Sequence, residues 1–127
     1  PFKIAGKLIY INQIALVDGK ILTPGKIGQA VSMDEAKLAT QAATLNVLAV
    51  LKSAVGGDLD QVKQAVQLTG FFNTIPKFTE HSKLMNASSD LLIKILGERG
   101  IHARAAIGAP SLPLDSPVEI QAIFEMK

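Results

Sequence analysis

The sequence contains no cysteine, which excludes a disulfide scaffold, a thiol nucleophile and a zinc site built on thiolates. Its two histidines, His81 and His102, lack the spacing to carboxylates that a metal site would need. The longest nearly continuous apolar run, around residues 45–51, is too short to cross a bilayer, and no signal sequence opens the chain. We therefore expect no metal site, no membrane contact and a cytoplasmic location.

Length and charge limit the remaining classes of protein. The chain has 127 residues, of which 48% are hydrophobic and 19% charged, so it can bury the core of one domain. With 13 Lys and Arg against 11 Asp and Glu, the formal net charge is +2, too small a surplus for a polybasic surface. The sequence predicts a single domain over residues 1–127 that does not bind nucleic acid.

The first half of the chain carries three local signals of secondary structure. Residues 7–13 are rich in strand-forming residues, and the Asp-Gly pair at 18–19 between two apolar runs is typical of a two-residue hairpin turn. The Ser-Met-Asp-Glu sequence at 32–35 is a capping box, which predicts the start of a helix. That helix should end at residue 55, before the Gly pair at 56–57.

The second half is predicted to alternate strands with one helix. Pro76 should occupy the first position of that helix, where its missing N–H costs nothing. Gly70, inside a predicted strand, indicates a bulge or a close backbone contact. The predicted elements are, in order, a strand at 62–73, a helix from Pro76 to Gly97 or Gly100, a strand at 102–108, a Pro-rich connector at 110–117 and a strand at 118–126.

The order β-β-α-β-α-β-β predicts an α+β fold, a two-layer sandwich with both helices on one face of the sheet. The opposite face of the sheet carries too many apolar residues for full exposure. Burial of this face against another subunit is the simplest explanation.

Two charged residues in apolar strands are candidate functional groups. Arg104 is either a solvated surface residue or a guanidinium that binds a carboxylate or phosphate at two points. Glu119 is either an exposed carboxylate or a group that positions water and moves protons. If their strands pair as a hairpin, the two side chains would approach each other, which an ordinary cross-strand ion pair would also explain.

Pro1 is a third candidate. An N-terminal proline is a secondary amine that acts as a general base in small trimeric tautomerases, and Phe2 and Ile4 follow it in strand-like alternation. The alternative is a trimmed N-terminus.

Three motifs stand close together in the C-terminal block of the chain: Ala-Arg-Ala-Ala-Ile-Gly at 103–108, Leu-Pro at 112–113 and Val-Glu-Ile-Gln-Ala at 118–122. Together they resemble the signature of the Rid (YjgF) family of reactive-intermediate deaminases. Further matches are residues 8–13 before the Asp-Gly turn, Asn46, residues 68–73 and Met85-Asn86.

The resemblance implies a chorismate-mutase-like fold with a mixed sheet, assembled as a homotrimeric barrel with ligand clefts between subunits. It further implies hydrolysis of enamines and imines such as 2-aminoacrylate to a 2-oxo acid and ammonia, without a metal or organic cofactor. Arg104 would bind the substrate carboxylate and Glu119 would orient water. The other implied contacts are Asn12, Asn86 from the adjoining subunit, and the backbone at Ala106 and Ile107.

The chain departs from the family pattern at several positions. Ala106 stands where a cysteine is common, Gln121 replaces a glutamate, and Asn12 replaces a glycine that lets backbone approach the ligand. The chain also begins inside the family pattern, so we expect that an N-terminal segment is absent and that Pro1 is not a catalytic terminus.

Two other functions remain open from the sequence. One is a trimeric small-ligand-binding or regulatory protein without catalysis. The other is an endoribonuclease or translation inhibitor, a label also attached to this family, although the chain shows no ribonuclease acid–base pair.

Overall fold

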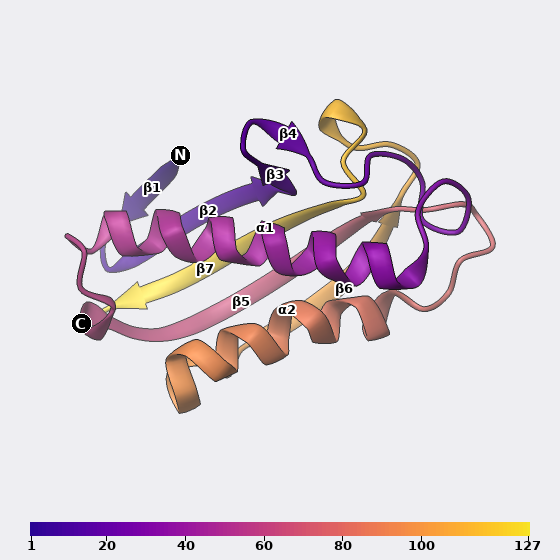
Figure 1. The fold of residues 1–127 in the computed structure, drawn as a ribbon. Helices are drawn as coiled ribbons and strands as arrows, with labels where there is room; N and C mark the ends of the chain where they lie inside the picture. Colours follow the sequence, from indigo (N-terminus) through magenta and orange to yellow (C-terminus); the bar gives the residue numbers. More distant parts are fainter.

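One five-stranded sheet and two helices form the two layers of the computed structural model, which describes all residues 1–127 (Figure 1). The strand order is β1-β2-β7-β5-β6, and every pair is antiparallel except β5 with β6. A separate ribbon pairs β3 with β4. The elements are β1 (Phe2–Ala5), β2 (Leu8–Ile14), β3 (Leu16–Val17), β4 (Lys20–Ile21), α1 (Met33–Ala54), β5 (Val62–Asn73), α2 (His81–Leu96), β6 (Ala103–Ala109) and β7 (Val118–Met126), with short 3-10 turns at Leu59–Gln61, Gly97–Gly100 and Pro113–Asp115.

The predicted boundaries of α1 are confirmed, because the local chemistry at both ends is strong. The Ser32 hydroxyl accepts from the Glu35 N–H at 3.1 Å, and the Glu35 carboxylate accepts from the Ser32 N–H at 3.0 Å. Gly56 and Gly57 then follow with φ of 71° and 91°, a left-handed backbone that ends the helix. The Asp18-Gly19 turn is confirmed in the same way, with positive φ at both positions.

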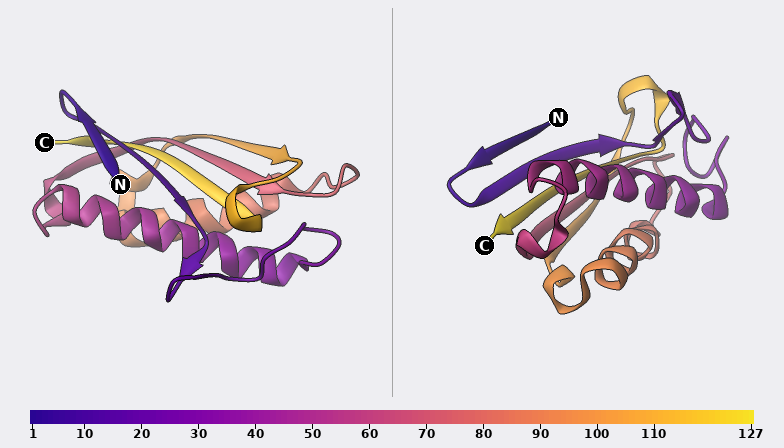
Figure 2. Two further views of the ribbon diagram at one scale, coloured as in Figure 1. Left: turned by 90° about the horizontal axis from the view of Figure 1, so that it is seen from above. Right: turned by 60° about the vertical axis from the view of Figure 1, so that its left-hand side comes forward.

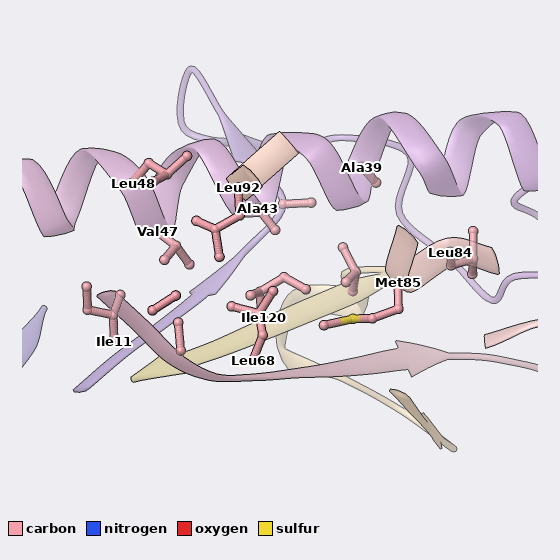
Figure 3. Close-up of a cluster of buried hydrophobic side chains, with 14 of the residues drawn as sticks. Ile11, Ala39, Ala43, Val47, Leu48, Leu68, Leu84, Met85, Leu92 and Ile120 are labelled. Atoms are coloured by element: carbon pink, nitrogen blue, oxygen red, sulfur yellow. The ribbon is translucent and has the colours of Figure 1, made fainter. Parts of the chain in front are cut away.

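The core lies between the helices and one face of the sheet, and it contains 23 buried hydrophobic residues (Figure 3). Both helices cover the same side of the sheet (Figure 2), as the sequence predicted. Alanines on the buried stripe of α1 let the helix approach the sheet closely, while Phe72 and Phe124 fill the larger spaces. Neither helix combines the length and apolar content that a bilayer span requires.

The second face of the sheet has no helix over it. Its side chains alternate with the buried ones and include Tyr10, Phe71, Ile107 and Ile123 beside polar residues. Tyr10 is 41% exposed and Ile107 45% exposed, so this open face presents apolar surface in a single chain.

The second helix begins at His81, not at Pro76. Pro76 instead follows Ile75 in a turn, in which the Phe78 N–H donates to the Ile75 carbonyl at 3.1 Å. Proline suits the second position of such a turn as well as the first position of a helix, so its presence alone did not distinguish them.

The last two strands do not pair as a hairpin. The chain leaves β6, passes the end of β5 and enters the sheet between β2 and β5 as β7. Asn73 at the end of β5 holds the connector there, because its side-chain amide donates to the Asp115 carboxylate at 3.2 Å and its backbone N–H to the Pro117 carbonyl at 2.9 Å. Leu114 and Asp115, both at positive φ, let the connector turn back sharply.

The packing around Gly70 leaves no room for a side chain at this position. A Cβ at this position would lie 2.5 Å from the Met85 sulfur and 2.9 Å from the Phe72 ring, so close packing rather than a bulge explains the glycine. We expect Gly70→Ala to lower the free energy of unfolding by about 1–3 kcal/mol through overpacking.

The partner of that clash is identified by a double-mutant cycle. In urea unfolding, Gly70→Ala combined with Met85→Ala should destabilise the protein by less than the sum of the single substitutions. Additive effects would show that the strain lies elsewhere.

Candidate functional site

Arg104 lies on β6, the edge strand of the sheet, on the side that faces α2. Its Nη1 donates to the Ser89 hydroxyl at 3.1 Å, and its Nη2 donates to the Ser82 carbonyl at 3.4 Å. The side chain is therefore exposed but leans along the helix instead of projecting into solvent.

No carboxylate of the chain pairs with Arg104. The two ion pairs in the structure join Lys63 to Glu125 and Lys83 to Glu80. The hydrogen bond from Lys83, together with its positive charge, holds the pKa of Glu80 below its usual value, so the Glu80 carboxylate has Lys83 as its partner. A guanidinium has five N–H donors, and Arg104 uses two of them, which leaves three for an anion.

The residues that follow Arg104 divide between the two faces of the sheet. Ala106 and Gly108 lie on the same face as Arg104, whereas the Ile107 side chain lies on the open face opposite Phe71. Ile107 can therefore reach a ligand beside Arg104 only through its backbone. Beyond Ala106, a cavity of about 410 Å³ is lined by Thr74, Pro76, Phe78, His81, Gly108, Ala109 and Pro110.

Glu119 and Asn12 come together on the open face. Glu119 lies opposite Ile14 in the register of β7 with β2, and Asn12 lies opposite Gln121. Asn12 and Glu119 line a shallow hollow of about 310 Å³ together with Gln13, Ile14 and Pro113. Neither side chain makes a hydrogen bond or an ion pair within the chain, so both are available to a ligand or to another subunit.

Arg104 and Glu119 do not meet within one chain. Their strands are separated by β5, a lateral distance of two strand spacings or about 10 Å, and their side chains point to opposite faces of the sheet. The hairpin pairing that would have brought the two side chains together does not form. A single chain presents two half-sites, one around Arg104 and one around Glu119.

Asn86 lies apart from Arg104 within one chain. Its side chain is exposed on α2 and lines a shallow hollow of about 350 Å³ with Lys37 and Gln41 of α1. It makes no hydrogen bond to Arg104, whose contacts on α2 are the Ser89 hydroxyl and the Ser82 carbonyl. The expectation that Asn86 acts on the site of an adjoining subunit stays a prediction.

Ser89 and His102 are the residues that the sequence analysis missed. His102 Nε2 lies 2.9 Å from the Ser89 hydroxyl that Arg104 contacts, and His102 Nδ1 lies 2.6 Å from the Gly100 carbonyl. The sequence did contain one signal for this contact, because His102 and Arg104 are two residues apart in an extended segment and so share a face. No group of three or more His, Asp or Glu side chains is arranged to hold a metal ion.

Comparison with known proteins now identifies the family. Residues 1–126 match the family described as "YjgF/chorismate_mutase-like, putative endoribonuclease". The chain belongs to this family. Its mixed sheet with two helices on one face is the YjgF/chorismate-mutase-like fold, and the resemblance seen in the sequence is confirmed.

Several relatives show how widely this fold is shared. A structure of the Agrobacterium tumefaciens protein Atu1372, of unknown function, is 40% identical with a TM-score of 0.98, over 100% of this chain and 80% of that one. A Shewanella oneidensis structure described as a "putative endoribonuclease" is 35% identical with a TM-score of 0.94, over 99% of this chain and 83% of that one. The Trypanosoma cruzi protein TCP17 is 40% identical over 80% of this chain, which spans 64% of its length.

The two half-sites predict a multimer, since only a second copy can bring them together. We expect analytical ultracentrifugation to give a mass about three times the 13.5 kDa of one chain, because the open face is buried between copies in a trimer. Ile123→Lys, at the centre of that face, should dissociate the assembly, because it would bury an unpaired charge. Leu38→Lys, on the 60% exposed outer side of α1, is the matched control and should leave the sedimentation unchanged. A monomeric wild-type protein at micromolar concentration would contradict this prediction.

Proposed function

We propose that this protein is a deaminase that hydrolyses small 2-imino acids, and their enamine tautomers, to 2-oxo acids and ammonia. The observation that carries the proposal is Arg104, a guanidinium at a free sheet edge with three unused donors and no carboxylate partner in the chain. A carboxylate with two oxygens is the anion that best matches the planar fork of an arginine.

The reaction needs only positioning and proton transfer. With its carboxylate on Arg104, a 2-imino acid has its imine carbon fixed within reach of a water molecule. The water oxygen bonds to that carbon as the π electrons of the C=N bond move to nitrogen, and Glu119 accepts the proton that the water loses. When this proton reaches nitrogen, the product is a carbinolamine with one hydroxyl and one amino group on the same carbon. The hydroxyl proton then passes through Glu119 to the amino group, the electron pair of the C–N bond leaves with ammonia, and an electron pair of the oxygen forms the C=O bond of the 2-oxo acid.

Glu119 must come from a second subunit in this proposal. In one chain it lies on the open face, remote from Arg104, but an assembly that packs the open face of one copy against the β6 edge of another would bring them together. This arrangement also explains the apolar residues on the open face, which would be buried between copies.

The residues that depart from the family pattern affect the substrate more than the chemistry. Ala106 offers a small side chain and its backbone on the face of Arg104, so no step depends on a thiol. Asn12 lines the hollow of Glu119, where its amide can contact the substrate or the water.

The description of some relatives as endoribonucleases supplies the second candidate function. RNA cleavage would require phosphate-binding groups beside an acid–base pair. The net charge of +2 offers no extended basic surface for a phosphate backbone. A ribonuclease activity on labelled RNA would favour this function over imine hydrolysis if the activity persisted through purification of the protein and were absent from Glu119→Gln.

The role of Arg104 is tested by substitution. Arg104→Ala should lower kcat/KM for 2-imino acids by roughly 30- to 1,000-fold, because a charge-assisted two-point contact contributes about 2–4 kcal/mol. Arg104→Lys should also lose most activity, since an ammonium cannot reproduce the planar fork. The assay is ammonia release from freshly generated 2-imino acids, with circular dichroism to show that the variants fold. Wild-type activity in Arg104→Ala would refute the assignment. Binding of 2-oxo acids without any turnover by the wild type would make the protein a ligand-binding regulator.

The shared site is tested by mixing subunits. Arg104→Ala and Glu119→Gln should each be nearly inactive, but a trimer assembled from both contains clefts with an intact Arg104 from one copy and an intact Glu119 from the next. Random mixing after reversible dissociation should restore activity to about a quarter of the wild-type value. If both residues acted within one subunit, mixing would restore nothing.

A further inference from the structure

A directional chain of hydrogen bonds runs from the Gly100 carbonyl through His102 and Ser89 to Arg104. The Gly100 carbonyl can only accept a hydrogen bond, so His102 Nδ1, at 2.6 Å, must carry a proton and donate it. In a neutral imidazole the other nitrogen then has no proton. Nε2 is therefore an acceptor, and the Ser89 hydroxyl, at 2.9 Å, donates to it.

The hydroxyl proton of Ser89 is thereby committed to His102, and its lone pairs face Arg104. Nη1 of Arg104 donates to this oxygen at 3.1 Å. A hydroxyl that donates to an imidazole becomes a stronger acceptor, because successive hydrogen bonds polarise one another. Without His102, a helical serine hydroxyl ordinarily bonds to the carbonyl four residues earlier and turns away from its outer neighbours.

The first members of this series of hydrogen bonds lie in rigid parts of the molecule. Ser89 is 7% exposed on the inner side of α2, and His102 is half-buried directly before β6. Arg104 is long, flexible and exposed, and its second contact, to the Ser82 carbonyl, is weak at 3.4 Å. Ser89 is therefore the group that best defines where the guanidinium lies.

We propose that His102 and Ser89 are positioning residues that hold the Arg104 guanidinium in the orientation that binds the substrate carboxylate. Neither residue touches the substrate. This inference rests on the proposed function, and it adds to that function a requirement for a neutral His102 with its proton on Nδ1. Preorganisation of the guanidinium lowers the entropy cost of binding, so the effect should appear in affinity.

Three variants test the individual hydrogen bonds between His102, Ser89 and Arg104. Ser89→Ala removes the link, and His102→Phe removes the imidazole nitrogens while retaining a flat ring. His102→Gln keeps a carbonyl oxygen near the position of Nε2 that can accept from Ser89. Ser88→Ala is the matched control, because Ser88 is a buried serine on the same helix that bonds to Thr44 of α1 at 2.6 Å and has no link to Arg104.

The decisive measurement is the dissociation constant of 2-oxobutanoate by calorimetry, with KM and kcat for imine hydrolysis alongside it. Ser89→Ala and His102→Phe should weaken binding and raise KM by roughly 5- to 30-fold, with a smaller change in kcat. His102→Gln should recover most of the affinity. Ser88→Ala should lower thermal stability but leave the affinity unchanged. Wild-type affinity in Ser89→Ala and His102→Phe, or equal weakening in Ser88→Ala, would overturn the proposal.

Nuclear magnetic resonance distinguishes failure of this inference from failure of the proposed function. If the wild type neither binds 2-oxobutanoate nor hydrolyses imines, the proposed function fails, and the positioning role is decided by spectra alone. Imidazole ¹⁵N shifts should show the Nδ1–H form of His102, and the Nε–H of Arg104 should be ordered in the wild type and mobile in Ser89→Ala. An Nε2–H form of His102, or equal Arg104 mobility in both proteins, would show that His102 and Ser89 do not position the arginine.

Discussion

The parallel pairing of β5 with β6 determines where the candidate groups of this protein lie. Parallel neighbours require a crossover, so α2 must cross the sheet before the chain can return as β6. β6 takes one edge of the sheet, and the last strand enters between β2 and β5. This strand order places Arg104 on the edge strand beside α2, and two strands away it places Glu119, whose side chain lies on the face that no helix covers.

Stability and the proposed chemistry depend on different parts of the molecule. The core between the helices and the sheet consists of apolar side chains, and the groups that could act on a ligand lie outside it. Arg104 avoids the desolvation that a buried guanidinium would suffer, because it stays exposed and hydrogen-bonds to α2. Its replacement should therefore affect ligand binding more than folding.

Sequence reasoning succeeded where a signal was local and failed where it depended on distant segments. The capping box at Ser32 and the Asp18-Gly19 turn contain their own hydrogen-bonding groups or backbone preferences, and both were predicted correctly. The position of β7 depends on a connector held by Asn73, which no local pattern encodes. Arg104 and Glu119 were singled out as charged residues in apolar strands that match the family motifs. Their placement on opposite faces of the sheet was not predicted, because it depends on the strand order.

The arginine alone cannot select a substrate in the proposed reaction, because every 2-imino acid carries the same carboxylate. Discrimination must come from the groups next to it, and the structure limits which these are. Arg104, Ala106 and Gly108 follow one another along a single face of β6, and the 410 Å³ cavity opens at the Gly108 end. The His81 and Thr74 side chains of the cavity wall pack directly over Gly108, since a Cβ at this position would lie 2.8 Å from His81 Nε2 and 3.2 Å from Thr74 Oγ1. The cavity contains the aromatic ring of Phe78, packed edge-on against His81 at 5.0 Å between ring centroids. In the proposed reaction, a substrate bound at Arg104 would extend its side chain past Ala106 toward a wall in which the Phe78 ring lies beside the polar groups of Thr74 and His81. No Asp, Glu, Lys or Arg lines this cavity, so it favours uncharged side chains over charged ones.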